Sequence, residues 1–403
     1  MIRNLLLLLL NVWLFSPVKA QTVGFNLPVR YGFEQEDRNE ISNAEKLLPF
    51  FDSLYQLKTF NKGTVSILHI GDSHLQADFL THTVRKNFQY RFGNAGRGLV
   101  IPFRVAHTNE PHTFQTSAEG NWESKRCIFP DQPLSIGIGG LTVRCVHPGQ
   151  KITVQVRSDS SLGYEFDRLK FFCLSNEQSF AYRFLDEEGI VLAEDTLNTN
   201  VVPIHLPELQ DRFILEPYRR NDQQNHATLF GFSLENGQPG VLYHTVGING
   251  AQYSHYNRAD YFAEQTAGLT PQLIIISLGT NEAHNSRLTM TEFYEHIGNL
   301  VQSLQQNNPQ AVLLLTTPAD SYKGRVPNTK LADIRQTILN YADDHHLPCW
   351  DLYGITGSAV NWRKKGLLLS DGVHYSRQGY ELQGNLLYQA LIRTYNHYVS
   401  ARL

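Results

Sequence analysis

The stretch Val65-Ser66-Ile67-Leu68-His69-Ile70-Gly71-Asp72-Ser73-His74 decides the fold. An apolar run that stops at a polar turn containing glycine is typical of a buried strand in a parallel sheet. The pattern recurs where residues 273–278 lead into Gly279-Thr280-Asn281-Glu282. In open α/β sheets, ligands bind at the carboxyl ends of the strands. The polar residues that follow these two strands are therefore expected to face one crevice.

Outward from these strands, strand and helix patterns alternate along the chain. Strands are expected at residues 65–70, 241–246, 273–278, 311–316 and 348–352, and helices at 41–57, 77–92, 253–265, 291–307, 330–345 and 377–398. Such alternation implies an α/β fold, a parallel sheet with helices on both faces.

Residues 105–240 have a different pattern of predicted secondary structure. Short β-rich runs at 141–146, 151–156, 169–174, 180–185, 213–216 and 228–234 follow one another without intervening helices. Regularly spaced short strands favour an all-β sandwich. The predicted organisation is an α/β domain in two parts, 21–104 and 241–403, with an inserted β-sandwich domain at 105–240.

The N-terminus has the pattern of a secretory signal peptide. Arg3 precedes a leucine run at residues 5–10, and Val18-Lys19-Ala20 offers small residues for cleavage before Gln21. The alternative, a membrane anchor, needs about 20 apolar residues, which this stretch lacks. No cysteine follows the run, so a lipid anchor is not indicated. The expected location is secreted or periplasmic, with no stable membrane span after cleavage of residues 1–20.

Composition narrows the remaining classes. The 403 residues carry 35 basic and 38 acidic side chains, and no basic stripe with interleaved aromatic residues appears, so nucleic-acid binding is not suggested. Cys127, Cys145, Cys173 and Cys349 are too few for a disulfide scaffold in an exported chain of this length. One bridge among the first three and buried thiols both remain open, and the oligomeric state is left undetermined.

Ser73 is the candidate nucleophile. It ends a strand and opens a helix, so its backbone N–H can donate to a developing oxyanion. The simpler explanation is that Ser73 only caps the helix. The pattern is not the Gly-x-Ser-x-Gly elbow, because Leu75 occupies the position of the second glycine.

Asp371 and His374 are the candidate orienting acid and general base. On a turn or a first helical turn, a spacing of three places both side chains on one face. Asp371 would then accept from one imidazole nitrogen while the other faces Ser73. The ordinary alternative is a helix start, with Ser370 or Asp371 as the cap and His374 in solvent.

Asn281 and Gly250 are candidate oxyanion donors. The Asn281 amide follows a strand end, and Gly250 could offer a backbone N–H at a close approach that only glycine allows. When each residue is taken alone, turn chemistry explains it better.

Taken together, four blocks in this order resemble the SGNH (GDSL-type) hydrolase superfamily. The blocks are Gly71-Asp72-Ser73-His74, Gly247-Ile248-Asn249-Gly250, Gly279-Thr280-Asn281-Glu282 and Asp371-Gly372-Val373-His374. The resemblance implies a three-layer, flavodoxin-like parallel-sheet hydrolase fold outside the insertion. It also implies that Ser73 is the nucleophile, His374 the base and Asp371 its orienter. The Ser73 N–H, the Gly250 N–H and the Asn281 side chain would form the oxyanion hole.

The expected activity is that of an exported serine esterase. His74 replaces the leucine of the plain GDSL form, a variant that resembles cell-envelope members acting on O-acetylated peptidoglycan, some with a β-sandwich insertion. The expected partner is an O-acylated glycan or peptidoglycan, and no cofactor is expected. An O-acyltransferase and a glycan-binding surface protein with a vestigial acyl site are the alternatives. Acyl length, alcohol and natural polymer are left open.

Several other polar and aromatic residues carry no specific prediction. Asp78 and Asp320 either line the pocket, cap a helix or face solvent. His107 and His112 lack a third ligand, so no metal site is predicted. Trp122, in the insertion, is expected to serve in packing rather than as a platform for sugars.

Overall fold

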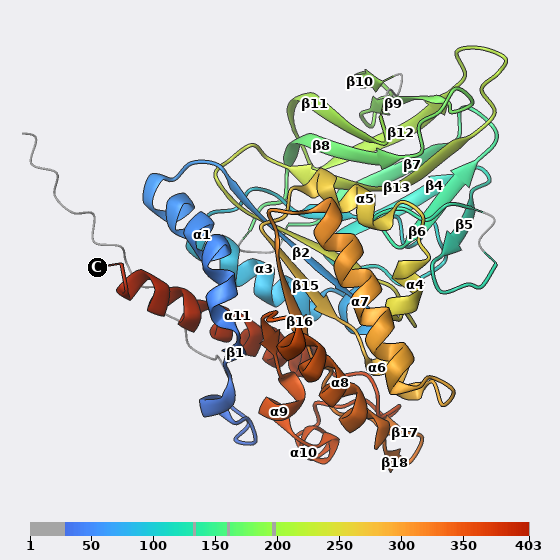
Figure 1. Ribbon diagram of the computed structural model, residues 1–403. Helices are drawn as coiled ribbons and strands as arrows, with labels where there is room; N and C mark the ends of the chain where they lie inside the picture. The colour runs from blue at the N-terminus through green and yellow to red at the C-terminus, as the bar shows by residue number, and fades with distance from the viewer. Residues whose placement is uncertain (1–28, 132–133, 159–161, 196–198, 403) are drawn as a thin grey trace, which may run out of the picture.

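The computed structural model describes residues 29–131, 134–158, 162–195 and 199–402 (Figure 1). The expected signal peptide at residues 1–20 lies outside the described residues. Among the helices of the described ranges, none is long and apolar enough to cross a membrane.

A mixed six-stranded sheet forms the centre of the α/β region. Its spatial order is β1 (Ile41–Ser42), β19 (Cys349–Trp350), β16 (Val312–Thr316), β15 (Leu273–Ser277), β2 (Thr64–Gly71) and β14 (Gly240–Gly247). The last five strands are parallel, and β1 pairs antiparallel with β19. Counted along the chain, the parallel strands lie in the flavodoxin order 2-1-3-4-5. The parallel sheet expected from the sequence is confirmed, and its topological switch point lies between β2 and β15.

Helices cover both faces of this sheet (Figure 1). One layer contains α1 (Leu48–Phe60), α3 (Phe79–Phe92) and α11 (Arg377–Ser400). The opposite layer contains α4 (Tyr253–Asn257), α5 (Phe262–Thr266), α7 (Met290–Asn307) and α8 (Lys330–Asp344). Strand alternation produces this division, because Ile67 of β2 packs in the first layer while Leu68 packs in the second.

Two expected helices are wrong in extent. The first begins at Leu48 instead of residue 41, because β1 pairs with β19 and Pro49 occupies the first turn of α1. The helix expected at 253–265 is broken into α4 and α5. At the break, the Tyr261 N–H donates to the carbonyl of Ile136 at 2.9 Å, which takes this backbone group out of a continuous helix.

Two antiparallel sheets occupy the part of the chain between β2 and β14. The first has the order β10 (Val191–Asp195), β9 (Ala181–Leu185), β12 (Arg212–Tyr218), β7 (Lys151–Val156) and β4 (Phe114–Glu119). The second has the order β11 (Val201–Gln210), β8 (Phe166–Cys173), β13 (Ala227–Glu235), β6 (Leu141–Cys145) and β5 (Glu123–Arg126), with β3 (Gly98–Val100) also paired to β13.

The two antiparallel sheets pack face to face through aromatic side chains. Phe213 of β12 lies with its ring centroid 5.1 Å from that of Phe232 of β13, and Phe171 of β8 lies 5.8 Å from Phe184 of β9. Strands β7 and β12 alternate buried and partly buried residues, as expected for strands that cover a core with one face.

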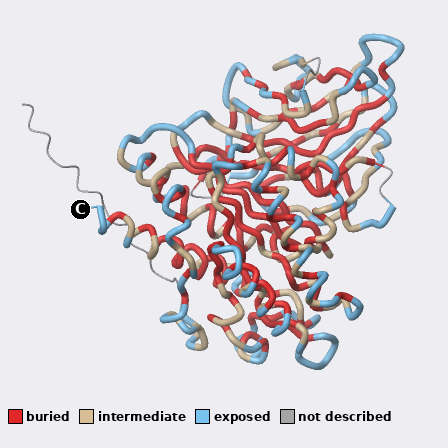
Figure 2. Tube along the Cα trace, viewed as in Figure 1, coloured by how far each residue is buried: buried red, intermediate tan, exposed pale blue. Residues whose placement is uncertain are grey.

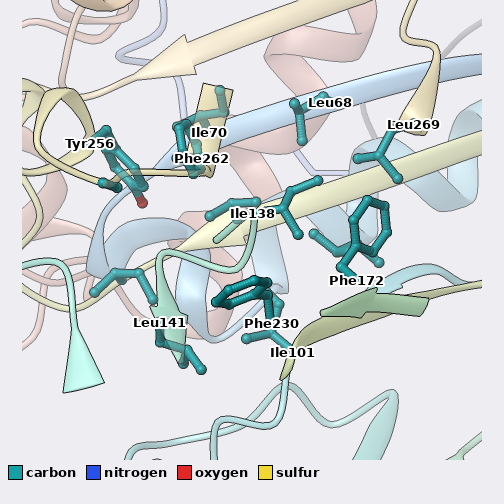
Figure 3. Packing of buried hydrophobic residues seen from close by; sticks show 14 of the residues in the cluster. Leu68, Ile70, Ile101, Ile138, Leu141, Phe172, Phe230, Tyr256, Phe262 and Leu269 are labelled. Atoms are coloured by element: carbon teal, nitrogen blue, oxygen red, sulfur yellow. The ribbon is translucent and has the colours of Figure 1, made fainter. Parts of the chain in front are cut away.

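Strand β13 is buried on both faces, because its second face packs against the α/β region. Leu68 and Ile70 of β2 belong to the same hydrophobic cluster as Phe172 and Phe230 of the antiparallel sheet (Figure 3). Figure 2 shows buried stretches of chain in both regions. The two regions therefore share one hydrophobic core.

All four cysteines are buried. Cys145, Cys173 and Cys349 are free thiols. Of the two alternatives left open by the sequence, one disulfide bridge or buried thiols, the structure has buried thiols. Burial raises the pKa of the Cys145 thiol to about 12, so it is protonated and unreactive at neutral pH.

Candidate active site

Ser73 lies at the topological switch point of the parallel sheet. It follows β2 directly and is the first residue of the short helix α2 (Ser73–Gln76). The cap of α2 is Asp72, whose carboxylate accepts the His74 N–H at 2.9 Å. Capping by Ser73 itself is therefore wrong, and its hydroxyl is left for another contact. As a residue in the first turn, Ser73 also has a backbone N–H without an acceptor inside the helix.

Asp371 and His374 lie on a turn just before α11. The His374 Nε2 atom is 2.9 Å from the Ser73 Oγ atom, although the two residues are 301 positions apart in the chain. On its other side, His374 Nδ1 lies 2.8 Å from Asp371 Oδ2. Helix α11 is capped by Ser376, whose hydroxyl accepts the Gly379 N–H. The alternative in which Ser370 or Asp371 caps this helix is thus excluded.

The Asp371 carboxylate both shapes the turn and orients the imidazole. Its Oδ1 atom accepts the backbone N–H groups of Val373 at 2.8 Å and His374 at 2.9 Å. Partial burial opposes ionisation, but these donors hold the pKa of Asp371 below its usual range. An ionised Asp371 accepts a proton-bearing Nδ1, so the Nε2 lone pair faces the serine hydroxyl. This arrangement can take a proton from Ser73.

Asn281 is brought close to Asp72 at the end of β15. It is the second residue of α6 (Thr280–His284), and its Nδ2 atom donates to the Ala251 carbonyl at 2.9 Å and to Asp72 Oδ2 at 3.1 Å. Both amide hydrogens are therefore engaged within the protein. Burial raises the pKa of Asp72 to about 7, and a carboxyl that is partly neutral is a weaker acceptor than a carboxylate. The bond to Asp72 is the one that Asn281 can more easily exchange for a ligand oxygen.

Gly250 also lies in this crevice, where its backbone conformation favours glycine. A Cβ atom at Gly250 would meet only Ile128 Cδ1 at 3.8 Å, an ordinary contact, so no neighbouring protein group requires glycine there. The backbone φ of +83° requires it instead, because side chains other than glycine rarely adopt this conformation.

A cavity of about 540 Å³ joins four of the five candidate residues. It is lined by Ser73, Ala77, Phe79, Asn109, Asn249, Gly250, Asn281, Leu369, Val373, His374, Tyr375 and Tyr380. The fifth candidate, Asp371, contacts His374 from outside this lining. The hydroxyl of Ser73, the imidazole of His374 and the amide of Asn281 thus converge on one space.

A pair of side chains that the sequence did not predict supports His374. The His74 ring lies 5.4 Å from the His374 ring, and its Nδ1 atom is 3.0 Å from the Tyr380 hydroxyl. Burial lowers the pKa of His74 to about 3, so this second imidazole is neutral and does not repel a protonated His374. The available signal was a histidine directly after the candidate nucleophile, followed by a tyrosine in the first turn of the last helix.

A second unpredicted group fixes the loop beside Gly250. The Gln76 side chain accepts the Asn249 N–H at 2.6 Å and donates to Thr108 and to the Asn109 carbonyl. Asn109 lines the cavity, so a residue within 105–240 forms part of its wall. No sequence pattern pointed to Asn109, because it lies in an irregular loop after β3.

Asp78 does not line the cavity, and it is not in solvent. Its fully buried carboxylate contacts Arg85 at 2.8 Å and Arg97 at 2.9 Å. Burial opposes its charge, but the two guanidinium groups hold the pKa of Asp78 well below its usual range. Asp320 is also buried, and its Oδ2 atom accepts the N–H of Ala359, the first residue of α10 (Ala359–Lys364), whose N-cap is Ser358.

His112 and Trp122 have packing contacts. His112 stacks on Phe79 with ring centroids 5.7 Å apart. Across the described ranges, no three His, Cys, Asp or Glu side chains are grouped to hold a metal ion. Trp122 is partly buried, packs against the core, and donates to the Glu119 carbonyl.

Comparison with known proteins assigns the class. Residues 218–382 match the GDSL-like Lipase/Acylhydrolase family, a range that includes Gly250, Asn281, Asp371 and His374 but not Ser73. No curated protein matches the chain by sequence. A structure described as "Peptidoglycan O-acetylesterase in action, 5 min" is similar over 86% of this chain and 96% of its own, with a TM-score of 0.68 and 22% identity. This likeness shows a common fold.

Two further similarities are much weaker. A family two carbohydrate esterase from Cellvibrio japonicus has 14% identity and a TM-score of 0.30, covering 71% of this chain and 99% of its own. The lipase/acylhydrolase from Enterococcus faecalis has 22% identity and a TM-score of 0.31, covering 38% and 77%. Neither carries an argument about this chain.

The fold and the family match define an acyl-ester hydrolase. More particularly, residues 218–382 match a GDSL-like lipase/acylhydrolase domain, which is consistent with the resemblance of the four sequence blocks to the SGNH (GDSL-type) hydrolases.

Proposed function

We propose that the chain is an exported serine esterase that hydrolyses small acyl esters, above all acetyl esters, on a carbohydrate or peptidoglycan. The observation that carries this proposal is the continuous chain of contacts from Asp371 through His374 to Ser73, with 2.8 and 2.9 Å between the hydrogen-bonding atoms. A serine hydroxyl beside an oriented imidazole is the arrangement needed for acyl transfer.

In the proposed mechanism, the Ser73 oxygen attacks the ester carbonyl while His374 Nε2 takes the hydroxyl proton. The carbonyl oxygen becomes an oxyanion, which accepts the backbone N–H groups of Ser73 and Gly250 and the Asn281 amide. The imidazolium, stabilised by Asp371, then protonates the departing sugar alkoxide. Water, deprotonated by His374, attacks the acyl-enzyme and releases the carboxylic acid, which restores Ser73.

The glycan substrate and the export are supported by separate observations. A protein with a similar fold along nearly the whole of both chains is described as a peptidoglycan O-acetylesterase. The leucine run and the small residues up to Ala20 support cleavage of residues 1–20 and a secreted or periplasmic location.

The proposed domain organisation assigns the chemistry to 21–104 and 241–403. Residues 105–240 are proposed as an inserted β-sandwich domain that takes part in polymer recognition. Two facing antiparallel sheets in this part of the chain and the presence of Asn109 in the cavity wall support this assignment.

The test compares the wild-type protein with Ser73→Ala on p-nitrophenyl esters of increasing chain length, and on O-acetylated cell wall and xylan. We expect fastest hydrolysis of the acetyl ester, release of acetate from a polymer, and loss of both activities in Ser73→Ala. Ser53→Ala, which removes a hydroxyl from α1, is the matched control. Turnover at the wild-type rate in Ser73→Ala would refute the mechanism, and a preference for long acyl chains would refute the small-acyl assignment.

A further inference from the structure

A cluster of two cations and an aromatic ring lies at the end of the edge strand β5. The Lys125 Nζ atom lies 5.6 Å from the centroid of the Phe129 ring, and the Arg126 guanidinium carbon lies 5.0 Å from it. Phe129 is 37% exposed, and both cationic side chains are partly exposed. The ring therefore supports two positive charges that solvent, or a ligand, can reach.

The charges of Lys125 and Arg126 have no acidic partner within the described part of the chain. Across the strand pair, Lys125 faces Thr142 and Arg126 faces Leu141. The neighbouring acid Glu123 faces Arg144 instead. The chain as a whole has a net charge of −3, so its overall charge does not attract an anionic polymer. Any such attraction must come from a local cluster of this kind.

The cluster adjoins the rim of the candidate active site. Ile128 lies between Arg126 and Phe129 in a turn closed by a 3.1 Å bond from the Phe129 N–H to the Arg126 carbonyl. The Ile128 side chain reaches to within 3.8 Å of the position of a Cβ atom on Gly250. Gly250 in turn lines the cavity that contains Ser73. In Figure 1, β5 and α4, which follows Gly250, lie on the same side of the molecule.

We propose that Lys125 and Arg126, supported by Phe129, form a subsite for a carboxylate of the glycan whose acyl ester lies at Ser73. This inference rests on the proposed function and names its substrate class, an O-acylated acidic glycan that bears carboxylates. The glycan would extend from the cavity past Gly250 and Ile128 to the two cations. A carboxylate accepts hydrogen bonds from both a guanidinium and an ammonium group, and among the described residues no carboxylate is paired with either cation.

Charged residues at a sheet edge have another known role. Lysine on an edge strand discourages pairing with a second chain. That role predicts a change in association state when the charges are removed, and no change in substrate preference. The two roles therefore separate experimentally.

The experiment uses the full chain with the double substitution Lys125→Gln/Arg126→Gln. Lys58→Gln/Lys62→Gln is the control, because it removes two exposed positive charges that precede the start of β2, whereas Ser73 follows the other end of this strand. Three substrates are compared: p-nitrophenyl acetate, O-acetylated peptidoglycan, whose peptide stems bear carboxylates, and neutral acetylated glucomannan. The kinetic constants are measured in low and high salt.

For Lys125→Gln/Arg126→Gln, we expect kcat/KM on O-acetylated peptidoglycan to fall about threefold to tenfold through a higher KM, the size of effect typical of exposed charge pairs. The aryl ester and glucomannan values should stay at the wild-type level. High salt should reduce the difference, because the two cations are exposed. An unchanged value on peptidoglycan, an equal fall on glucomannan, or self-association with unchanged kinetics would overturn the subsite.

A failure of the proposed function gives a different result. If the wild-type protein hydrolyses the aryl ester but releases acetate from neither polymer, the glycan assignment fails. Co-sedimentation of Ser73→Ala with peptidoglycan, with and without the double substitution, then decides the subsite separately. Binding that does not depend on Lys125 and Arg126 would refute it.

Discussion

The parallel and antiparallel regions of this molecule differ in what their strand ends carry. In the parallel sheet, β2 and β15 end side by side, and Ser73 and Asn281 follow them. In the antiparallel sheets, strands point both ways, so polar turn residues are distributed over two opposite edges. A parallel arrangement therefore gathers reactive groups that an antiparallel one disperses. The candidate catalytic residues all lie in the α/β region. The two regions nevertheless share one hydrophobic core, so we expect them to unfold together.

The largest expected effect is a loss of catalytic activity without a loss of stability. Ser73→Ala should lower kcat/KM on p-nitrophenyl acetate by at least about 10⁴-fold, which corresponds to about 5.5 kcal/mol of transition-state stabilisation. His374→Ala should cost about as much, because triad members act as a unit. Thermal unfolding should match that of wild type, since Ser73 lies outside the hydrophobic clusters.

Asp371→Asn should cost less than either substitution, since the asparagine oxygen can still accept the two backbone N–H groups that shape the turn. A loss as large as that of His374→Ala would mean that Asp371 does more than orient the ring.

The next largest expected effect is a loss of stability caused by a substitution in the shared hydrophobic core. Phe230→Ala should lower the free energy of unfolding by about 3–5 kcal/mol, because Phe230 is fully buried between the two regions. Unfolding followed by circular dichroism and by tryptophan fluorescence should give one transition. Phe60→Ala, at an exposed ring, is the matched control. Two separate transitions in the wild-type protein would contradict the shared core.

A smaller effect tests the crevice at the switch point. Asn281→Ala should lower kcat by about 10²–10³-fold with little change in KM, because its amide would act on the tetrahedral intermediate. Steady-state kinetics on the acetyl ester measure both constants. A change confined to KM would assign Asn281 to ground-state binding.

The smallest expected effect concerns Glu282, which lies beside Asn281. Burial raises the pKa of its carboxyl to about 8, and its Oε1 atom accepts the Tyr253 N–H at 2.8 Å. A raised carboxyl pKa gives stability that is complete below pH 4.5 and lost as the pH rises through about 8. Glu282→Gln keeps the acceptor without the charge, so it should be more stable than wild type at pH 9 by about 1–3 kcal/mol.

Urea unfolding of Glu282→Gln at pH 5 and pH 9 measures this difference, with Glu295→Gln on the exposed side of α7 as control. A gain of equal size at both pH values would show that ionisation of Glu282 is not the cause.

Local sequence patterns were sufficient to predict the main elements of the α/β region. The apolar run at 65–70 could be recognised as a buried strand because parallel strands are buried on both faces. The helix expected at 253–265 was wrong because its break depends on Ile136, a residue distant in the chain. The sequence alone could not show that Gly250 has a φ of +83°, because it does not reveal the backbone conformation that makes glycine favourable at a given position.

By itself, the sequence determined the kinds of element and the residue types available for chemistry, because periodicity and short motifs are local properties. Tertiary structure alone decided that Ser73 and His374 lie in contact, that Asp78 is paired with two arginines, and that Asn109 reaches the cavity. It also decided that Leu68 and Phe230 share one core. Such contacts depend on how the sheets and helices pack. Packing brings together residues that are far apart in the chain, so no local sequence pattern predicts it.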